Sequence, residues 1–455
     1  MALVSALKQR IPQPRLQSRP EYFDSTPIEI LATLPTSEGN LVIYHVNNPF
    51  SLGAALYNSK SPEQLLWRSE KPFWLTTEKI KVEAIRESAG TITFSYSWKK
   101  ALFNIEFYLN EILMVAKPRS FPSLQRVITN PILEPDSAHS WESCAVFNTA
   151  VLYLAGKVHF VYRAIGDSGL SVLGYAASKD GIHIDERSAE PIYVAQDILG
   201  QRRQRDPRYM SGSSWAGCED PRLTKIDDTI YMTYTAFDGA NPPGVALTSI
   251  SVDDFLNKRW NWQKSRVISA PDEIHKNWVI FPEKINNKFA ILHSITPEIL
   301  IDYFTDLHSD ENDYIDSYYA SPAGRENYWD SWIRGVGPPP IKIDEGWLIL
   351  YHAMDRRDPN KYKIGAKILD KNNPRRILYR SSTPLLEPET KYENSGYKAG
   401  VVYSCGAVVM NDKLFVYYGG ADTVICVATM YLQQLIEQLK GQPAAELVEA
   451  SLENL

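Results

Sequence analysis

Hydrophobic and polar residues alternate along many short runs of this chain, and five of the runs share one form. Each begins with a turn rich in Gly, Asn or Asp and continues as alternating aromatic and aliphatic residues that lead to Tyr or His. The five runs are GKVHFVYRA (156–164), DDTIYMTYTA (227–236), NNKFAILHS (286–294), DEGWLILYHA (344–353) and NDKLFVYYGG (411–420). Alternation with a period of two, bounded by turn residues, predicts a β-strand.

A second short strand candidate precedes each of these runs, and in four copies a third follows, so each copy predicts a small antiparallel sheet. Successive copies begin about 58 to 71 residues apart, and a unit of three or four strands at this spacing is typical of a β-propeller blade. Five copies therefore predict five blades. The first strand of each blade lines the central channel. The segment GCEDPR (217–222) opens the first strand of the second copy, so we expect it at this channel.

The rest of the chain is also patterned. Residues 1–125 contain further alternating runs, such as NLVIYHV and TITFSYSW, and predict a separate, accessory β-rich region. Residues 126–440 form the predicted propeller and end in a helix, and residues 441–455 form a polar tail. The expected fold is therefore all-β, a five-bladed β-propeller with an additional small N-terminal β domain and a C-terminal helix.

Composition narrows the classes of partner. The 455 residues include 11% aromatic residues, an excess that suits strands and also stacking against sugar rings. A net charge of −6 without a basic block argues against nucleic acid. The chain has no apolar run of membrane-spanning length, and its four cysteines form no CxxC pair, so we expect a cytoplasmic protein without a membrane partner. We expect no metal site, because the histidines form no HxH or HExxH pattern.

Five ordered motifs resemble one known family. They are WESCAVFNTA, GCEDPRLTKIDDTIYMTYTA, KNWVIFPEKINNKFAILH, GVGPPPIKIDEGWLILYHA and CGAVVMNDKLFVYYGGADTVICVAT. In this order they resemble glycoside hydrolase family 130, the mannoside phosphorylases and mannosidases built on a five-bladed propeller. The resemblance runs from about residue 130 to residue 436 and does not include the N-terminal region.

Inverting cleavage of a glycosidic bond needs one carboxylic acid to protonate the leaving oxygen and a nucleophile on the opposite face of the sugar. In a phosphorylase, phosphate is that nucleophile. The resemblance places the general acid at Asp220, which would act through a sugar hydroxyl, and makes Glu219 and Arg222 its partners in orienting the substrate. A neighbouring carboxylate also predicts a raised pKa for Asp220. The alternative is that the three residues are only a solvated turn.

The resemblance also implies a phosphate site made of basic residues and Asn. This chain has Lys276 with Asn277 at the first expected position and Arg334 at the third. At the second position, where the family has Arg, this chain has Ser294. Lysine binds phosphate as a point charge, whereas arginine binds it through two parallel hydrogen bonds. Arg356 or Arg357 could compensate, although an ion pair with a neighbouring aspartate is the simpler explanation for both.

For the sugar, the resemblance indicates Asp422 and, less directly, Asn148. Tyr351 and His352 lie at a matching position and could contact phosphate or the reacting sugar, with core packing as the alternative for Tyr351. Glu283 is a candidate base for hydrolysis, or else the partner of a lysine. The segment WDSW (329–332) is either a stacking platform for an acceptor sugar or a structural plug.

These residues together predict an enzyme that cleaves β-mannosidic bonds of short oligosaccharides with inversion and releases mannose 1-phosphate. Its partners are an oligosaccharide and inorganic phosphate, which serves as co-substrate, with no other cofactor; a homo-oligomer is left open. Hydrolytic relatives carry glutamates among the phosphate positions, and Lys276, Ser294 and Arg334 are not acidic. The alternatives are a β-mannosidase on the same scaffold and a non-catalytic propeller that binds carbohydrate or protein.

Overall fold

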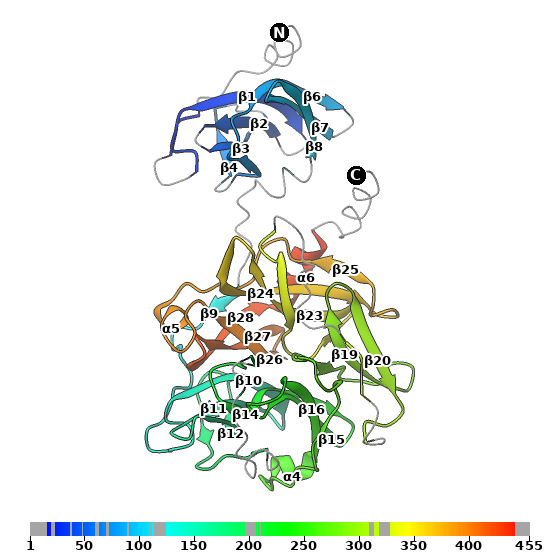
Figure 1. Ribbon diagram of the computed structural model, residues 1–455. Helices are drawn as coiled ribbons and strands as arrows, with labels where there is room; N and C mark the ends of the chain where they lie inside the picture. Colours follow the sequence, from blue (N-terminus) through cyan, green and yellow to red (C-terminus); the bar gives the residue numbers. More distant parts are fainter. Residues whose placement is uncertain are drawn as a thin grey trace. The chain divides into compact units, whose positions relative to one another are not determined.

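Strands are the main regular elements of the computed structural model, and helices are few (Figure 1). The chain divides into two compact units, Met1–Phe121 and Pro122–Leu455. The predicted tail 441–455 lies outside the described residues except for Gly441. The structure describes residues 16–19, 23–36, 39–47, 49–59, 63–69, 72–88, 91–109, 112, 124–195, 206, 208–209, 211–308, 314–317 and 328–441.

The first unit contains two antiparallel sheets. One has the order β1-β2-β3-β4, with β5 also paired to β3, and the other has the order β6-β7-β8. Buried residues of both sheets form one shared core, for example Ile43 and Leu52 from the first sheet and Phe94 from the second. The strands are β1 (Ile28–Thr36), β2 (Gly39–Val46), β3 (Phe50–Tyr57), β4 (Leu65–Arg68), β5 (Trp74–Thr76), β6 (Lys81–Ser88), β7 (Thr91–Trp98) and β8 (Ala101–Tyr108).

The second unit contains five consecutive sets of antiparallel strands. The first set is β10 (Ala145–Leu154), β11 (Lys157–Ile165), β12 (Leu170–Ser178) and β13 (Glu186–Arg187). The second is β14 (Ala216–Ile226), β15 (Thr229–Phe237), β16 (Gly244–Ser251) and β17 (Arg266–Val267). The third is β18 (Val279–Ile280), β19 (Phe289–Ile295) and β20 (Ile299–Phe304). A short parallel pairing between β12 and β14 joins the first two sets into one sheet.

The fourth set is β21 (Trp332–Val336), β22 (Ile341–Ile343), β23 (Gly346–Asp355), β24 (Asp358–Asp370) and β25 (Ile377–Arg380). The fifth is β26 (Val402–Met410), β27 (Lys413–Gly420), β28 (Val424–Tyr431) and β9 (Gln125–Arg126), which comes from the start of the unit. The five alternating runs of the sequence fall on β11, β15, β19, β23 and β27, so the predicted strands are confirmed there. Each of these strands pairs on both sides within its set.

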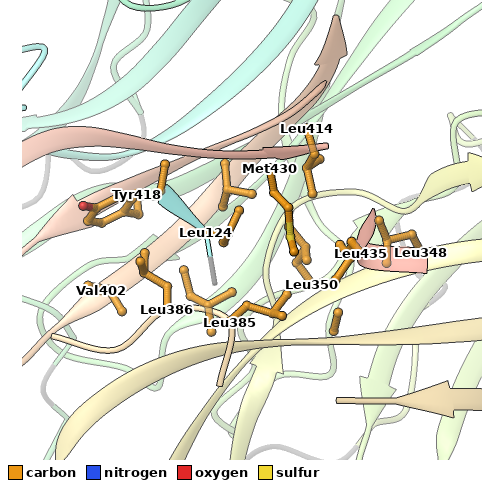
Figure 2. Close-up of a cluster of buried hydrophobic side chains, with 14 of the residues drawn as sticks. Leu124, Leu348, Leu350, Leu385, Leu386, Val402, Leu414, Tyr418, Met430 and Leu435 are labelled. Atoms are coloured by element: carbon orange, nitrogen blue, oxygen red, sulfur yellow. The ribbon is translucent and has the colours of Figure 1, made fainter. Parts of the chain in front are cut away.

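Five hydrophobic clusters pack these sets against one another. They lie between the first and second sets, the second and third, the third and fourth, the fourth and fifth, and the fifth and first. Figure 2 shows the cluster between the fourth and fifth sets, where Leu350 of β23, Leu386 and Met430 of β28 come together. Each set therefore packs against a neighbour on two sides. Burying one such side chain contributes about 1.5–3 kcal/mol, so the clusters stabilise this packing.

The described helices are short and lie at the ends of the strand sets. They are α4 (Val252–Leu256), α5 (Lys391–Asn394) and α6 (Leu432–Lys440). Helix α6 follows β28 and buries Leu435, Ile436 and Leu439 in the cluster of Figure 2. Within the described residues, no helix combines the length and apolar character needed to span a bilayer.

Candidate functional site

Four residues of the predicted site have a left-handed backbone, with φ of 49° at Asn148, 51° at Asp220, 67° at Asn277 and 52° at Asp422. Non-glycine residues seldom adopt positive φ, and those that do gather at turns and functional sites. In β10 and β14 the strand pairing also shifts register at these residues, which is the mark of a β-bulge. A bulge changes the direction of a side chain, so Asn148 and Asp220 leave the regular alternation of their strands.

Asp220 is buried and held by two donors from the first strand set. Its Oδ1 accepts a hydrogen bond from Asn148 Nδ2 at 2.8 Å and another from Arg163 Nη1 at 3.1 Å. Arg163, on β11, is 1% exposed, and its Nη2 also donates to Glu219 Oε1 at 3.0 Å. One guanidinium therefore bridges the two neighbouring carboxylates. Sequence reasoning missed Arg163, although a lone arginine in an apolar run is a signal, because a buried guanidinium needs a carboxylate partner.

Glu219 is fully buried and pairs with two positively charged side chains. Besides Arg163, its carboxylate accepts hydrogen bonds from Ser214 at 3.1 Å and from Ser211, and it lies 3.4 Å from Lys276 Nζ. The Lys276 ammonium also donates to Ser211 Oγ. These contacts leave Glu219 no exposed surface for a substrate, so its predicted role becomes that of a positioning residue for Arg163 and Lys276.

The electrostatics of Asp220 differ from the prediction of a raised pKa. Burial alone would raise the pKa of Asp220, but the positive charges of Arg163, Arg222 and Lys276 and the Asn148 hydrogen bond outweigh it, and the pKa is lowered. The prediction failed because it considered only the neighbouring carboxylate. The pKa of Asp422 is instead raised, because burial and the charge of Asp220 outweigh Lys398 and Arg163. The two aspartates thus shift in opposite directions.

Arg222 does not contact the side chain of Asp220. Its guanidinium donates to backbone oxygens of Asp220 at 2.7 Å and Gly337 at 2.9 Å, and to Asn277 Oδ1 at 2.9 Å. The side chain is 2% exposed, and its pKa is raised despite burial by the charges and hydrogen bonds around it. Arg222 therefore ties the second, third and fourth strand sets together, and its predicted contact with substrate is replaced by a positioning role.

The residues predicted to bind phosphate lie around one small pocket. Lys276, Asn277 and Arg334 all line it, together with Ser294, and none of the described lining residues is an aspartate or glutamate. The Asn277 side chain is largely engaged within the protein, because Oδ1 accepts from Arg222 and from the Tyr403 hydroxyl at 2.6 Å, while Nδ2 donates to the Arg334 backbone oxygen at 2.8 Å. The lysine and arginine among the described lining residues are Lys276 and Arg334.

Ser294 does not replace the missing guanidinium. Its hydroxyl donates to the backbone oxygen of Thr296 at 2.9 Å, which closes a local turn. Arg357 does not compensate either, since its guanidinium binds Asp355 at 2.7 Å. The guanidinium of Arg334 donates from Nε to the Tyr362 hydroxyl at 3.0 Å and lies 4.8 Å from the ring of Trp332. Aromatic contacts of this kind orient Arg334 at the pocket.

Tyr351 and His352 are adjacent on β23 and point to opposite faces of the sheet. Tyr351 belongs to the core between the third and fourth sets, where its hydroxyl donates to Asp330 Oδ2 at 2.6 Å. Its predicted contact with substrate or phosphate is therefore not supported, and the core-packing alternative describes it. His352 stacks on Tyr403 at 3.8 Å, and its Nε2 accepts from the Ser404 backbone N–H at 2.9 Å.

His352 is a neutral imidazole in this environment. Burial and the charge of Arg222 lower the pKa of His352 to about 3. Because Nε2 accepts a hydrogen bond, the proton of the neutral ring is on Nδ1. His352 thus supports Tyr403, whose hydroxyl binds Asn277, rather than supplying positive charge.

The remaining candidates are Glu283 and the two tryptophans of WDSW. The Glu283 side chain is 44% exposed and binds Lys342 at 2.6 Å, so Glu283 is the partner of a lysine. Trp329 is buried in the core and stacks on Tyr351, which makes it structural, whereas Trp332 contacts Arg334.

Comparison with known proteins identifies the family of this chain. The sequence profile of glycoside hydrolase family 130, described as beta-1,4-mannooligosaccharide phosphorylase, matches residues 123–441. The chain is 37% identical over 319 residues to a 1,2-beta-oligomannan phosphorylase of Thermoanaerobacter sp. (strain X514), covering 69% of this chain and 98% of that protein. It is also 37% identical over 320 residues to a beta-1,2-mannobiose phosphorylase of the same strain, covering 68% and 97%.

A solved structure is similar over the same part of the chain. The beta-1,2-mannobiose phosphorylase from Listeria innocua, in complex with beta-1,2-mannobiose, aligns with a TM-score of 0.54 and 26% identity, over 70% of this chain and 99% of that one. The profile match covers the strand sets that carry Asn148, Asp220, Lys276, Arg334 and Asp422. The chain therefore belongs to glycoside hydrolase family 130.

Proposed function

We propose that this protein is a phosphorylase that cleaves β-mannosides with inversion and releases mannose 1-phosphate. One observation carries the choice of phosphate over water as the nucleophile: among the residues that the structure describes, no carboxylate lines the pocket that contains Lys276 and Arg334. Phosphate is already an anion and needs cations around it, whereas water needs a carboxylate base. The names of the relatives at 37% identity support the same choice.

In the proposed reaction, phosphate oxygen forms a bond to the anomeric carbon while the bond from that carbon to the leaving sugar oxygen breaks. Asp220 supplies the proton that the leaving oxygen gains. The proton passes through a hydroxyl of the mannose whose anomeric carbon is attacked. The proton that phosphate loses on becoming an ester restores the acid. Phosphate bound near Lys276 would also offset the positive charge that lowers the pKa of Asp220. Asp220 would then be protonated when both substrates are bound.

We also propose that the five strand sets are the blades of a β-propeller. The support is cyclic packing, since a hydrophobic cluster lies between every two successive sets and another lies between the fifth and the first. Strand β9 from the start of the unit completes the fifth set by pairing with β28. Cyclic packing of this kind suits a closed ring of sheets. The site residues come from all five sets, as expected for a site on the axis of such a ring.

For the linkage, we propose β-1,2. The relatives named for β-1,2-linked substrates are 37% identical to this chain, while a beta-1,4-mannooligosaccharide phosphorylase of Ruminococcus albus is 28% identical. Inorganic phosphate is the proposed co-substrate, with no other cofactor. A β-mannosidase is the second candidate, but Glu283, its candidate base, is 44% exposed and paired with Lys342.

The test is incubation of the purified protein with β-1,2-mannobiose and with β-1,4-mannobiose, each with and without inorganic phosphate. We expect mannose 1-phosphate from the β-1,2 substrate only when phosphate is present. Free mannose in both conditions would instead establish hydrolysis, and no turnover of either substrate would favour a binding protein. We expect Asp220→Asn to lower turnover by roughly 10²- to 10⁴-fold, the usual contribution of a general acid. An unchanged circular dichroism spectrum controls for folding.

A further inference from the structure

A second, larger pocket lies in the second strand set. Its volume is about 560 Å³, within the range of roughly 300–1,000 Å³ that is common for ligand sites. Its walls come from the ends of β15, β16 and β17, from the loop of residues 269–273 and from Tyr314. In one wall, Asp238 Oδ1 closes a turn by accepting hydrogen bonds from the backbone of Ala240 at 2.9 Å and of Asn241 at 2.8 Å.

The strand register places this pocket at the same end of the sheet as Asp220. Gly217 of β14 pairs with Phe237, Ala236 pairs with Gly244, and the pairing of β16 with β17 continues outward. From β14 to β17 are three strand spacings, roughly 14 Å, a distance that a short oligosaccharide spans. The loop that forms the wall also continues directly into Lys276, so the pocket neighbours the proposed phosphate site.

The lining of this pocket has the chemistry of a sugar site. The half-exposed Tyr314 provides an aromatic ring, while the rings of Tyr234 and Phe237 are buried behind the wall, and Asp272 and Glu273 provide hydrogen-bond acceptors. None of the lining residues that the structure describes is lysine, arginine or histidine. An anion such as phosphate would therefore meet negative charge here, whereas a neutral chain with many hydroxyls finds acceptors and the ring of Tyr314. The small pocket around Lys276 has the opposite character.

We propose that this second pocket binds the leaving part of the substrate, the β-mannooligosaccharide chain beyond the bond that is cleaved. The proposal rests on the proposed function, because a phosphorylase that releases one mannose unit at a time leaves the rest of the chain on one side of Asp220. A disaccharide is too short to extend from Asp220 into the pocket, whereas a tetrasaccharide reaches it. The pocket thus makes the protein selective for longer chains.

Two substitutions at exposed positions test the pocket. Tyr314→Ala removes the exposed ring, and Val267→Trp, on the edge strand β17, fills the pocket from its wall. Tyr153→Ala is the matched control, because Tyr153 has the same exposed fraction of 47% as Tyr314 and lies at the turn end of β10, away from the bulge that carries Asn148. Isothermal titration calorimetry without phosphate measures binding of β-1,2-mannobiose and β-1,2-mannotetraose to each variant.

We expect the unmodified protein to bind the tetrasaccharide more tightly than the disaccharide. Tyr314→Ala should weaken tetrasaccharide binding by roughly 2- to 12-fold, the size of one aromatic contact, and leave disaccharide binding unchanged. Val267→Trp should act in the same direction, and Tyr153→Ala should change neither affinity. Equal affinity of the unmodified protein for both ligands, or equal losses for both ligands in the two pocket variants, would overturn the proposal.

Binding and turnover are separate readouts in this experiment. If the unmodified protein makes no mannose 1-phosphate yet prefers the tetrasaccharide, and both pocket variants lose that preference, the pocket stands and the proposed function fails. If mannose 1-phosphate forms but kcat/KM is the same for the two chain lengths in every variant, the function stands and the pocket assignment is wrong.

Discussion

The replacement of Arg163 by Met tests whether one buried guanidinium organises the site. Arg163 bridges Glu219 at 3.0 Å and Asp220 at 3.1 Å, and its Nε donates to Ser171 Oγ at 2.7 Å. Methionine keeps most of the apolar stem but removes the charge, so two carboxylates stay buried without their shared partner. Removing one member of a buried ion pair costs about 3–5 kcal/mol, and we expect Arg163→Met to lower the free energy of unfolding by that amount near neutral pH.

The loss should depend on pH in a definite direction. In the unmodified protein the lowered pKa of Asp220 contributes stability above its unfolded pKa, and this contribution disappears as the pH falls through the folded value. Without Arg163 the largest charge that opposes burial is gone, so the pKa of Asp220 should rise. The ionised form then destabilises the variant at neutral pH, and protonation relieves this as the pH falls. The difference in stability should therefore shrink toward acid.

Urea denaturation of the full chain at about pH 7.5 and about pH 5 measures the difference in unfolding free energy between the variant and the unmodified protein. Arg259→Met is the matched control, because Arg259 also contacts two carboxylates, Asp253 and Asp254, but is 49% exposed. Such surface pairs contribute little, so only a small change is expected for the control. A loss for Arg163→Met no larger than that of the control, or one that does not change with pH, would refute the reasoning. Arg163→Lys keeps the positive charge but not the paired N–H donors of the guanidinium. Its loss of unfolding free energy should lie between the losses of Arg163→Met and Arg259→Met.

Two further substitutions test the proposed phosphate site and the hydrolytic alternative. Lys276→Gln should lower kcat/KM for phosphate by roughly 10- to 150-fold, the value of one charge-assisted hydrogen bond. It should also move the alkaline limb of the pH–activity profile to higher pH, because a charge that lowers the pKa of Asp220 is lost. Lys284→Gln, at an exposed lysine, is the control, and an alkaline limb that moves to lower pH contradicts the assignment. Glu283→Gln should leave turnover unchanged, because the Glu283 carboxylate is at the surface with Lys342, and loss of activity in steady-state assays would restore it as a candidate base.

Much of the strand pattern could be predicted because its causes are local. The alternation in runs such as DEGWLILYHA corresponds to the buried strand β23, and the turn residues before it mark where the strand begins. The residues expected at the phosphate site, Lys276, Asn277 and Arg334, line one pocket as the ordered motifs implied. The same local pattern could not separate Tyr351 from His352, since alternation shows that neighbours face opposite sides but not which side is the core.

The sequence by itself determined the order of the strands. It also identified the aspartate in GCEDPR as the candidate acid, and the basic side chains that could bind an anion. Only the tertiary structure decided what surrounds each of them. Arg163 meets Asp220 across 57 residues, and Arg222 reaches Gly337 across 115 residues, so neither pair leaves a trace in sequence spacing. The lowered pKa of Asp220 follows from Arg163 and Lys276, which are distant in sequence, together with the nearby Arg222 and the Asn148 hydrogen bond, and not from its neighbour Glu219. The physical reason is that electrostatic interaction depends on distance in space and on burial, and both are set by the packing of separate strand sets.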